Sequence, residues 1–267
     1  MQTINNDDVR QAVRARYGSI AETRSSEAGC CAPTSCCETS MTPGLDEKAY
    51  AMGYSAEETA AVPEGANLAL GCGNPTAIAA LQAGETVLDL GSGAGFDCFL
   101  AARAVGDTGH VIGVDMTPEM LHKARENAAK GGFTNVAFRL GEIEHLPVAD
   151  ASVDVILSNC VINLSPEKSQ VFREAYRVLK PGGRLAVSDV VTTAPLPEKI
   201  QHDLSFKTCC VAGAALIDDL QQMLREAGFT DICIEPKDES KTFIRTWVPG
   251  SHIEEYIVSA TIAAFKP

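Results

Sequence analysis

The sequence predicts an α/β fold built on a doubly wound, mostly parallel sheet of seven strands. From residue 84 onwards, short apolar runs of strand length alternate with stretches of helical periodicity. The first run, TVLDL, leads into a glycine-rich turn, and the second, HVIGVD, ends in an acidic residue. Strands that alternate with helices in units of this length are joined by crossovers, which makes the strands parallel.

The first 75 residues are expected to form an extension that leads into the site. Residues 6–20 place their apolar side chains on one helical face, which predicts an amphipathic helix. Residues 23–44, TRSSEAGCCAPTSCCETSMTPG, are rich in Ser, Thr, Gly, Pro and Cys, so we expect a loop. Residues 46–75 are expected to be short helix and loop, ending in the motif GCGNP.

Residues 76–195 are expected to form the cofactor-binding core. The predicted strands are TVLDL, HVIGVD, NVAFRL, SVDVILSN and GGRLAVSDVV. The first predicted helix follows the glycine loop and ends near Val105, and the second begins at Pro118. The third runs from Pro166 to Leu179, after which a PGG turn reverses the chain.

Residues 196–267 are expected to complete the sheet and the substrate site. A helical stretch carries the Cys209–Cys210 pair, and DDLQQMLREAG has the pattern of an amphipathic helix. TDICIEP and EYIVSATIAAF are expected to be the closing strands.

Charge and composition exclude several classes of protein. With 22 Lys and Arg against 35 Asp and Glu, the formal charge is −13, and no run of basic residues offers a surface for nucleic acid or anionic lipid. No stretch is apolar for long enough to span a bilayer, and the start MQTINNDDVR lacks the pattern of a signal peptide. We therefore expect a cytoplasmic protein that acts on small molecules and not on nucleic acid or membranes.

The glycine-rich turn has the context of a nucleotide-type loop. Gly91, Gly93 and Gly95 follow a strand and open a helix, so backbone N–H groups can meet a ligand. Asp115 ends the next strand, where it can accept hydrogen bonds from a ribose diol. Asp89 precedes the first glycine; a carboxylate there suits a cationic, amine-bearing ligand and would repel a pyrophosphate.

The ten cysteines point to soft-metal or redox chemistry, because intracellular thiols are kept reduced. Cys72 lies between two glycines and is expected to be sterically open. Cys160 ends a predicted strand, at the edge where open α/β sheets bind ligands. Cys209 and Cys210 would point about 100° apart on a helix, so only one of them can face a common site.

The other cysteines and the histidines have simpler interpretations. Cys98 and Cys233 are expected to be small core residues, and the five histidines to be surface or strand-end residues that supply no catalytic base. The two vicinal pairs of CCAPTSCC predict a flexible loop that captures metalloid or exchanges disulfides, with a zinc site as the alternative; these cysteines are Cys30, Cys31, Cys36 and Cys37.

Thiolates select soft, thiophilic centres. Trivalent arsenic is such a centre, and it keeps a lone pair after three sulfurs bind. Three thiolates from different parts of the chain would hold it as a pyramid with the lone pair free, and no general base would then be required.

The core resembles class I S-adenosylmethionine (SAM)-dependent methyltransferases, which have a Rossmann-like fold. The resemblance covers about residues 84–192 and is carried by VLDLGSGAGF, GVDMT, GEIEHLP and LKPGGRLAVSD. It implies methionine and amino-group contacts near Asp89, Gly91 and Gly93, and ribose contacts at Asp115. It also implies adenine contacts, by stacking on Met116 and at the base edge by Glu142 and Ile143.

Over nearly the whole chain, the sequence resembles the arsenite methyltransferase family. AVPEGANLALGCGNP, LSNCVINLS, KTCCVAG, WVPG and the closing YIVSATIAAFKP carry this resemblance. It implies that Cys72, Cys160 and Cys210 bind arsenic and that Asn159 and Val161 border SAM. It further implies arsenic detoxification, a redox-active cysteine in the N-terminal loop, and glutathione or thioredoxin as the reductant.

Two other functions remain open on the sequence alone. The chain could be a small-molecule C- or O-methyltransferase with incidental thiols. It could also be a thiol-rich, non-catalytic metalloid-binding protein on a methyltransferase scaffold. The three cysteine motifs argue against the first alternative, and the glycine loop with Asp115 argues against the second.

Overall fold

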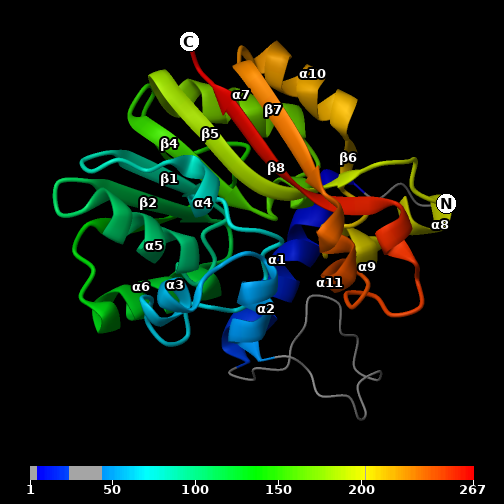
Figure 1. The fold of residues 1–267 in the computed structure, drawn as a ribbon, viewed down its shortest axis with the longest axis horizontal. Coiled ribbons are helices and arrows are strands. Elements are labelled where there is room, and N and C mark those ends of the chain that lie inside the picture. Colours follow the sequence, from blue (N-terminus) through cyan, green and yellow to red (C-terminus); the bar gives the residue numbers. More distant parts are fainter. Residues whose placement is uncertain (1–4, 24–43, 202) are drawn as a thin grey trace.

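A computed structural model describes residues 5–23, 44–201 and 203–267. One sheet organises these residues, with the strand order β3-β2-β1-β4-β5-β8-β7 and the two-residue β6 beside β5 (Figure 1). The strands are β1 (Thr86–Leu90), β2 (His110–Asp115), β3 (Val136–Leu140), β4 (Val153–Asn159), β5 (Leu179–Thr192), β6 (Ala215–Leu216), β7 (Thr230–Lys237) and β8 (Ile257–Phe265).

The sheet is parallel except at one side, where β8 runs antiparallel to both β5 and β7. The predicted doubly wound, mostly parallel fold is confirmed, and the two closing strands come from the C-terminal segment as expected. The small strand β6 was not predicted, because two residues carry no recognisable alternation.

Helices cover both faces of this sheet (Figure 1). The helices are α1 (Asn6–Glu22), α2 (Leu45–Ala51), α3 (Ala56–Ala60), α4 (Thr76–Ala79), α5 (Phe96–Val105), α6 (Pro118–Gly131), α7 (Lys168–Val178), α8 (Glu198–Gln201), α9 (Leu204–Lys207), α10 (Ile217–Ala227) and α11 (Lys241–Ile244), with the 3₁₀ turns η1 (Ile162–Leu164), η2 (Asp238–Ser240) and η3 (Ile253–Glu255). The central strands are buried on both sides, which explains why they read as continuous apolar runs.

Two local predictions differ from the structure. The strand predicted from residue 182 already begins at Leu179, and a register shift opposite Val153 and Val155 accommodates the PGG turn. Cys209 and Cys210 do not lie on a helix but in a turn after α9, where Cys210 has a φ of 66°. The prediction failed because the residues around this pair, KTCCVAG, have no helical periodicity that could distinguish a short helix from a turn.

The strands β1, β2, β4 and β5 are parallel, so their carboxyl ends all lie along the same end of the sheet. Helix α1 lies against this end and packs on α6, α9 and η1 (Figure 1). The glycine loop, Asp115, Cys160 and Cys72 therefore come to one end of the molecule. Among the residues that the structure describes, no helix is long and apolar enough to cross a membrane.

Candidate active site

A pocket opens where β1 and β2 end, and the glycine loop forms its floor. Gly93 has a φ of 52° and donates its N–H to Asp115 Oδ2 at 2.9 Å, while Thr117 N–H donates to Asp115 Oδ1 at 2.8 Å. A Cβ added at Gly93 would meet no atom within 4 Å, whereas one added at Gly91 would lie 2.5 Å from Val161. The loop thus needs glycine for two reasons: at Gly91 for close packing, and at Gly93 for a left-handed backbone next to open space.

Buried carboxylates lie at one end of the pocket. Asp97 accepts a hydrogen bond from Tyr54 Oη at 2.6 Å and another from Asn159 Nδ2 at 3.2 Å. Burial raises the pKa of Asp97 to about 6, although these two bonds lower it. Burial and the neighbouring Asp97 also raise the pKa of Asp89 well above its ordinary value. Two carboxylates held together in this way favour a cationic group beside them.

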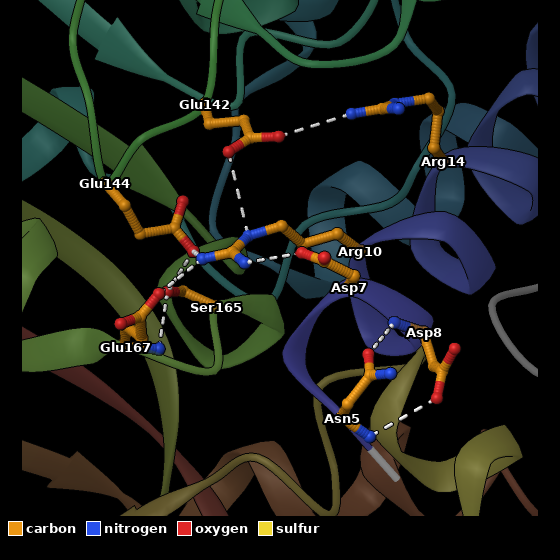
Figure 2. Close-up of polar contacts among 9 residues, drawn as sticks. All are labelled: Asn5, Asp7, Asp8, Arg10, Arg14, Glu142, Glu144, Ser165 and Glu167. Atoms are coloured by element: carbon orange, nitrogen blue, oxygen red, sulfur yellow. Dashed lines mark hydrogen bonds and ion pairs between the residues drawn. The ribbon is translucent and has the colours of Figure 1, made fainter.

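Helix α1 closes another side of the pocket, to which it contributes Arg10, Val13 and Tyr17. Arg10 Nη2 lies 3.3 Å from Glu144 and 2.5 Å from Glu167 (Figure 2). Glu144 is buried, lines the pocket and also accepts a hydrogen bond from Ser165 Oγ at 2.7 Å. One half-buried guanidinium therefore ties α1 to the segments that follow β3 and β4.

Glu142, predicted to contact adenine, does not line the pocket. Figure 2 shows its carboxylate between two side chains of α1, with Arg10 Nε at 3.7 Å and Arg14 Nη2 at 3.4 Å. The other predicted cofactor residues in the described part of the chain do line it; these are Asp89, Gly91, Gly93, Asp115, Met116, Ile143 and Asn159.

Cys72 is buried, with 1% of its surface exposed, which contradicts the expectation of a sterically open thiol. Its N–H donates to Asn159 Oδ1 at 3.0 Å, and its carbonyl accepts from Ser259 Oγ at 2.7 Å. A Cβ at Gly71 would lie 2.6 Å from Asn159 Nδ2, and one at Gly73 would lie 2.9 Å from Ser188. The two glycines therefore allow the loop to press against the sheet edge, rather than exposing the thiol.

The thiols of Cys72, Cys160 and Cys210 form one buried cluster. The sulfurs of Cys72 and Cys160 lie within 4.8 Å of each other, and Cys210 Sγ donates to the Cys160 carbonyl at 2.8 Å. Of the three, Cys160 lines the cofactor pocket. Cys209 Sγ instead donates to the Phe206 carbonyl at 3.6 Å.

The backbone at two of these thiols is left-handed, with φ of 57° at Cys160 and 66° at Cys210. Non-glycine residues in this region cost about 1–3 kcal/mol each and cluster at functional sites. A strained backbone at two thiols of one buried cluster is a mark of a site rather than of simple core packing.

The surroundings raise the pKa of all three thiols above the ordinary value, which favours their protonated form. Burial raises the pKa of Cys72 to about 11, against a lowering by Cys160. The contact with Cys210 lowers the pKa of Cys160, but Cys72, burial and nearby Asp189 together raise it well above its ordinary value. The contact with Cys160, followed by burial, raises the pKa of Cys210 well above its ordinary value.

Asp189, a buried residue of β5, completes the cluster. One carboxylate oxygen of Asp189 and the sulfurs of Cys72 and Cys160 lie within 4.8 Å of one another. Val190 N–H and Asn163 Nδ2 each donate to Asp189 Oδ1 at 2.8 Å. Burial raises the pKa of Asp189 to about 6, against these hydrogen bonds.

Other predicted residues have mixed outcomes. Cys98 is buried as expected, and its thiol also donates to Asp89 at 3.2 Å. The prediction of a core position for Cys233 is wrong, because β7 is an edge strand and this thiol is exposed. The histidines of the described residues are exposed, as expected. Cys30, Cys31, Cys36 and Cys37 lie outside the described residues.

Sequence reasoning missed Tyr54, Asp97, Glu144 and Asp189. Asp97 and Asp189 could have been found, because the first lies in the first helical turn of α5 and the second near the carboxyl end of a core strand. Tyr54 and Glu144 reach the site through tertiary packing, which no local pattern reports.

Comparisons with known proteins identify the family of the chain. The profile of the family described as "Methyltransferase domain" matches residues 81–228, more than half of the chain. A Halobacterium salinarum protein named arsenite methyltransferase is 56% identical over 98% of this chain, and one of the same name from Aquipseudomonas alcaligenes is 40% identical over 84%. The chain spans 67% and 62% of the lengths of these two relatives.

A solved structure is also similar. CrArsM, an arsenic(III) S-adenosylmethionine methyltransferase from Chlamydomonas reinhardtii, has a TM-score of 0.62 and 36% identity, covering 85% of this chain and 75% of its own. The fold and the pocket thus define a class I SAM-dependent methyltransferase. Within that class, the chain belongs to the arsenite methyltransferase family.

The residues of the pocket fit SAM. Gly93 leaves a cradle beside Asp115, whose carboxylate the loop already orients, and Asp89 and Asp97 offer negative charge to an amine. This donor set differs from a pyrophosphate site, which two buried carboxylates would oppose.

Proposed function

We propose that this protein methylates trivalent arsenic, delivered as arsenous acid or as thiol conjugates, with SAM as the methyl donor and in the service of arsenic detoxification. The observation that carries the proposal is the buried contact of three thiols from distant parts of the chain, one of which opens into the cofactor pocket. Cys72, Cys160 and Cys210 are the proposed arsenic ligands. They come respectively from three proposed parts, residues 1–75, 76–195 and 196–267.

Protonated thiols suit this binding step. Each thiol forms an S–As bond as its proton leaves with the displaced group, as water from arsenous acid or as free thiol from a conjugate. Charge is conserved inside the protein, and no neighbouring base has to store a proton. The raised thiol pKa values are therefore compatible with binding of the metalloid, and the absence of histidine among the described pocket residues is not an obstacle.

Pocket residues have separate proposed roles toward the cofactor. Asp89, with Asp97 beside it, holds the amino group, while the N–H groups of the loop from Gly91 to Gly93 meet the methionine part. Asp115 accepts from the ribose, Met116 stacks on adenine, Ile143 borders the base, and Asn159 and Val161 separate the cofactor from the thiols. When bound, SAM would supply an electrophilic methyl group, to which three-coordinate arsenic can donate its lone pair.

Methylation formally oxidises arsenic by two electrons, so turnover needs a reductant. Two protein thiols that pass to a disulfide would return these electrons and release two protons. We propose that a cysteine of the N-terminal loop takes part and that glutathione or thioredoxin resets it.

The test is arsenic speciation after incubation of the purified enzyme with SAM, arsenite and glutathione, with and without thioredoxin. Cys160→Ser should reduce methylated arsenic by at least about 100-fold, because a soft ligand is lost, while SAM binding persists. Cys233→Ser, which removes an exposed thiol, is the matched control and should retain both properties. Undiminished turnover by Cys160→Ser would remove this thiol from the mechanism.

A further inference from the structure

The described residues contain a group of possible metal ligands that includes a carboxylate, which arsenic does not need. A carboxylate oxygen of Asp189 and the sulfurs of Cys72 and Cys160 all lie within 4.8 Å of one another. Pyramidal trivalent arsenic is satisfied by three thiolates, so Asp189 has no role as its ligand. The question is which occupant would use two thiols and a carboxylate together.

We infer that Cys72, Cys160 and Asp189 form a three-ligand binding site for a thiophilic divalent cation such as Zn²⁺, whose fourth position a water molecule would fill. Zinc accepts both thiolate and carboxylate ligands in a tetrahedral set, at about 2.3 Å and about 2.0–2.2 Å. Two ligand atoms of such a tetrahedral centre are about 3.5–3.8 Å apart. The observed group, within 4.8 Å, would therefore have to contract by about 1 Å through side-chain rotation to close on the ion.

The surroundings of Asp189 are those of an oriented ligand. Hydrogen bonds from Val190 N–H and Asn163 fix the carboxylate, as the outer contacts of metal-binding carboxylates commonly do. Cys72 is fixed in the same way, through its N–H to Asn159 and its carbonyl to Ser259. Two of the three ligands are therefore held in place before any ion arrives.

The charges also balance. Two thiols release their protons to solvent as they bind the ion, so two thiolates and a carboxylate bring three negative charges. The cation supplies two positive charges, and the Lys168 ammonium, close enough to interact with Asp189 and Cys210, supplies the third. Lys168 is anchored at this position by a hydrogen bond to the Ser165 carbonyl at 3.1 Å.

Arsenic and the cation would thus share two ligands and differ in the third. Arsenic uses Cys210 and leaves Asp189 free, whereas the cation uses Asp189 and needs Cys210 less. Binding is mutually exclusive, so Zn²⁺ should compete with arsenite but not with SAM.

The test uses the full chain with Cys30, Cys31, Cys36, Cys37 and Cys233 replaced by Ser, because these thiols could bind cations elsewhere. Co²⁺ titration of the reduced protein reports thiolate ligation by its charge-transfer absorption, and chelator competition gives the Zn²⁺ affinity. One Zn²⁺ should bind per chain, and Asp189→Asn should weaken this binding by at least about 10-fold, while arsenite affinity stays unchanged. Cys210→Ser should do the reverse.

Equal Zn²⁺ affinity in Asp189→Asn and in the parent protein would overturn the inference, and so would a parallel loss of arsenite and Zn²⁺ binding in that variant. SAM binding and the unfolding temperature serve as checks of folding. If Asp189→Asn does not fold, the parent protein decides: Zn²⁺ must displace arsenite one for one without displacing SAM. Zinc binding without arsenic methylation would refute the proposed function alone, and methylation without zinc binding would refute this inference alone.

Discussion

Asn159 connects the two parts of the site through a single side chain. Its Oδ1 accepts the Cys72 N–H, and its Nδ2 donates to Gly73, Tyr54 and Asp97. The position of the first thiol is thereby linked to the carboxylates that face the cofactor pocket. Asn159, which was expected only to border the cofactor, also holds the loop that carries Cys72 in place.

The pKa of Asp97 predicts how cofactor affinity varies with pH. A ligand ammonium favours the ionised carboxylate, so below pH about 6 binding must first expel a proton. The dissociation constant of SAM should therefore rise by about tenfold per pH unit below this value. Calorimetry across this range measures the effect.

Asp97→Asn is the control for this prediction. The variant should bind SAM more weakly at neutral pH but lose the rise of the dissociation constant below pH about 6. An unchanged rise in Asp97→Asn would show that another group, such as Asp89, is responsible.

At the scale of elements, the loop that carries Cys72 fits tightly on the ends of β4 and β5. Gly71→Ala should destabilise the protein by about 1–3 kcal/mol and lower activity, because the new methyl group would displace the Asn159 amide. Gly44→Ala is the matched control, since its φ is −58° and a Cβ there meets no atom within 4 Å. Chemical denaturation compares the two, and equal stabilities would contradict the tight fit.

Helix α1 covers the cofactor pocket through one main anchor, Arg10. Arg10→Ala should weaken SAM binding by about tenfold, because Glu144 would be left buried without its cation and the helix would lose its tie to Glu167. Arg14→Ala provides the comparison. The Arg14 side chain is 44% exposed, and in the described residues its ion pair is with Glu142. A similar loss in Arg14→Ala would assign the effect to the general charge of α1.

The sequence predicted the sheet well and the contacts of its loops poorly, for a physical reason. Buried parallel strands and the glycine loop depend on local residues, so their patterns can be read along the chain. The burial of Cys72 depends on Asn159, Ser188 and Ser259, which come from three separate strand segments. The turn at Cys210 and the exposure of Cys233 likewise depend on what the rest of the fold places beside them.

At the scale of the whole molecule, the proposed function predicts a separable role in turnover for the N-terminal thiols. Replacing Cys30, Cys31, Cys36 and Cys37 by Ser should slow repeated methylation but spare the first transfer, because oxidised arsenic could no longer be reduced by that loop. Single-turnover and steady-state arsenic speciation separate the two rates. If both rates fall equally, the loop serves arsenic capture instead.

The three proposed ligands lie far apart in the chain, and two of them have a strained backbone. Arsenic bound to all three would act as a removable cross-link that closes two long loops, and closure of long loops disfavours the unfolded chain. Binding of the substrate would thus offset the free-energy cost of the strained backbone in its own site. Since a ligand that binds only the folded state also shields a protein from degradation, cells exposed to arsenic would accumulate this protein without any change in its synthesis.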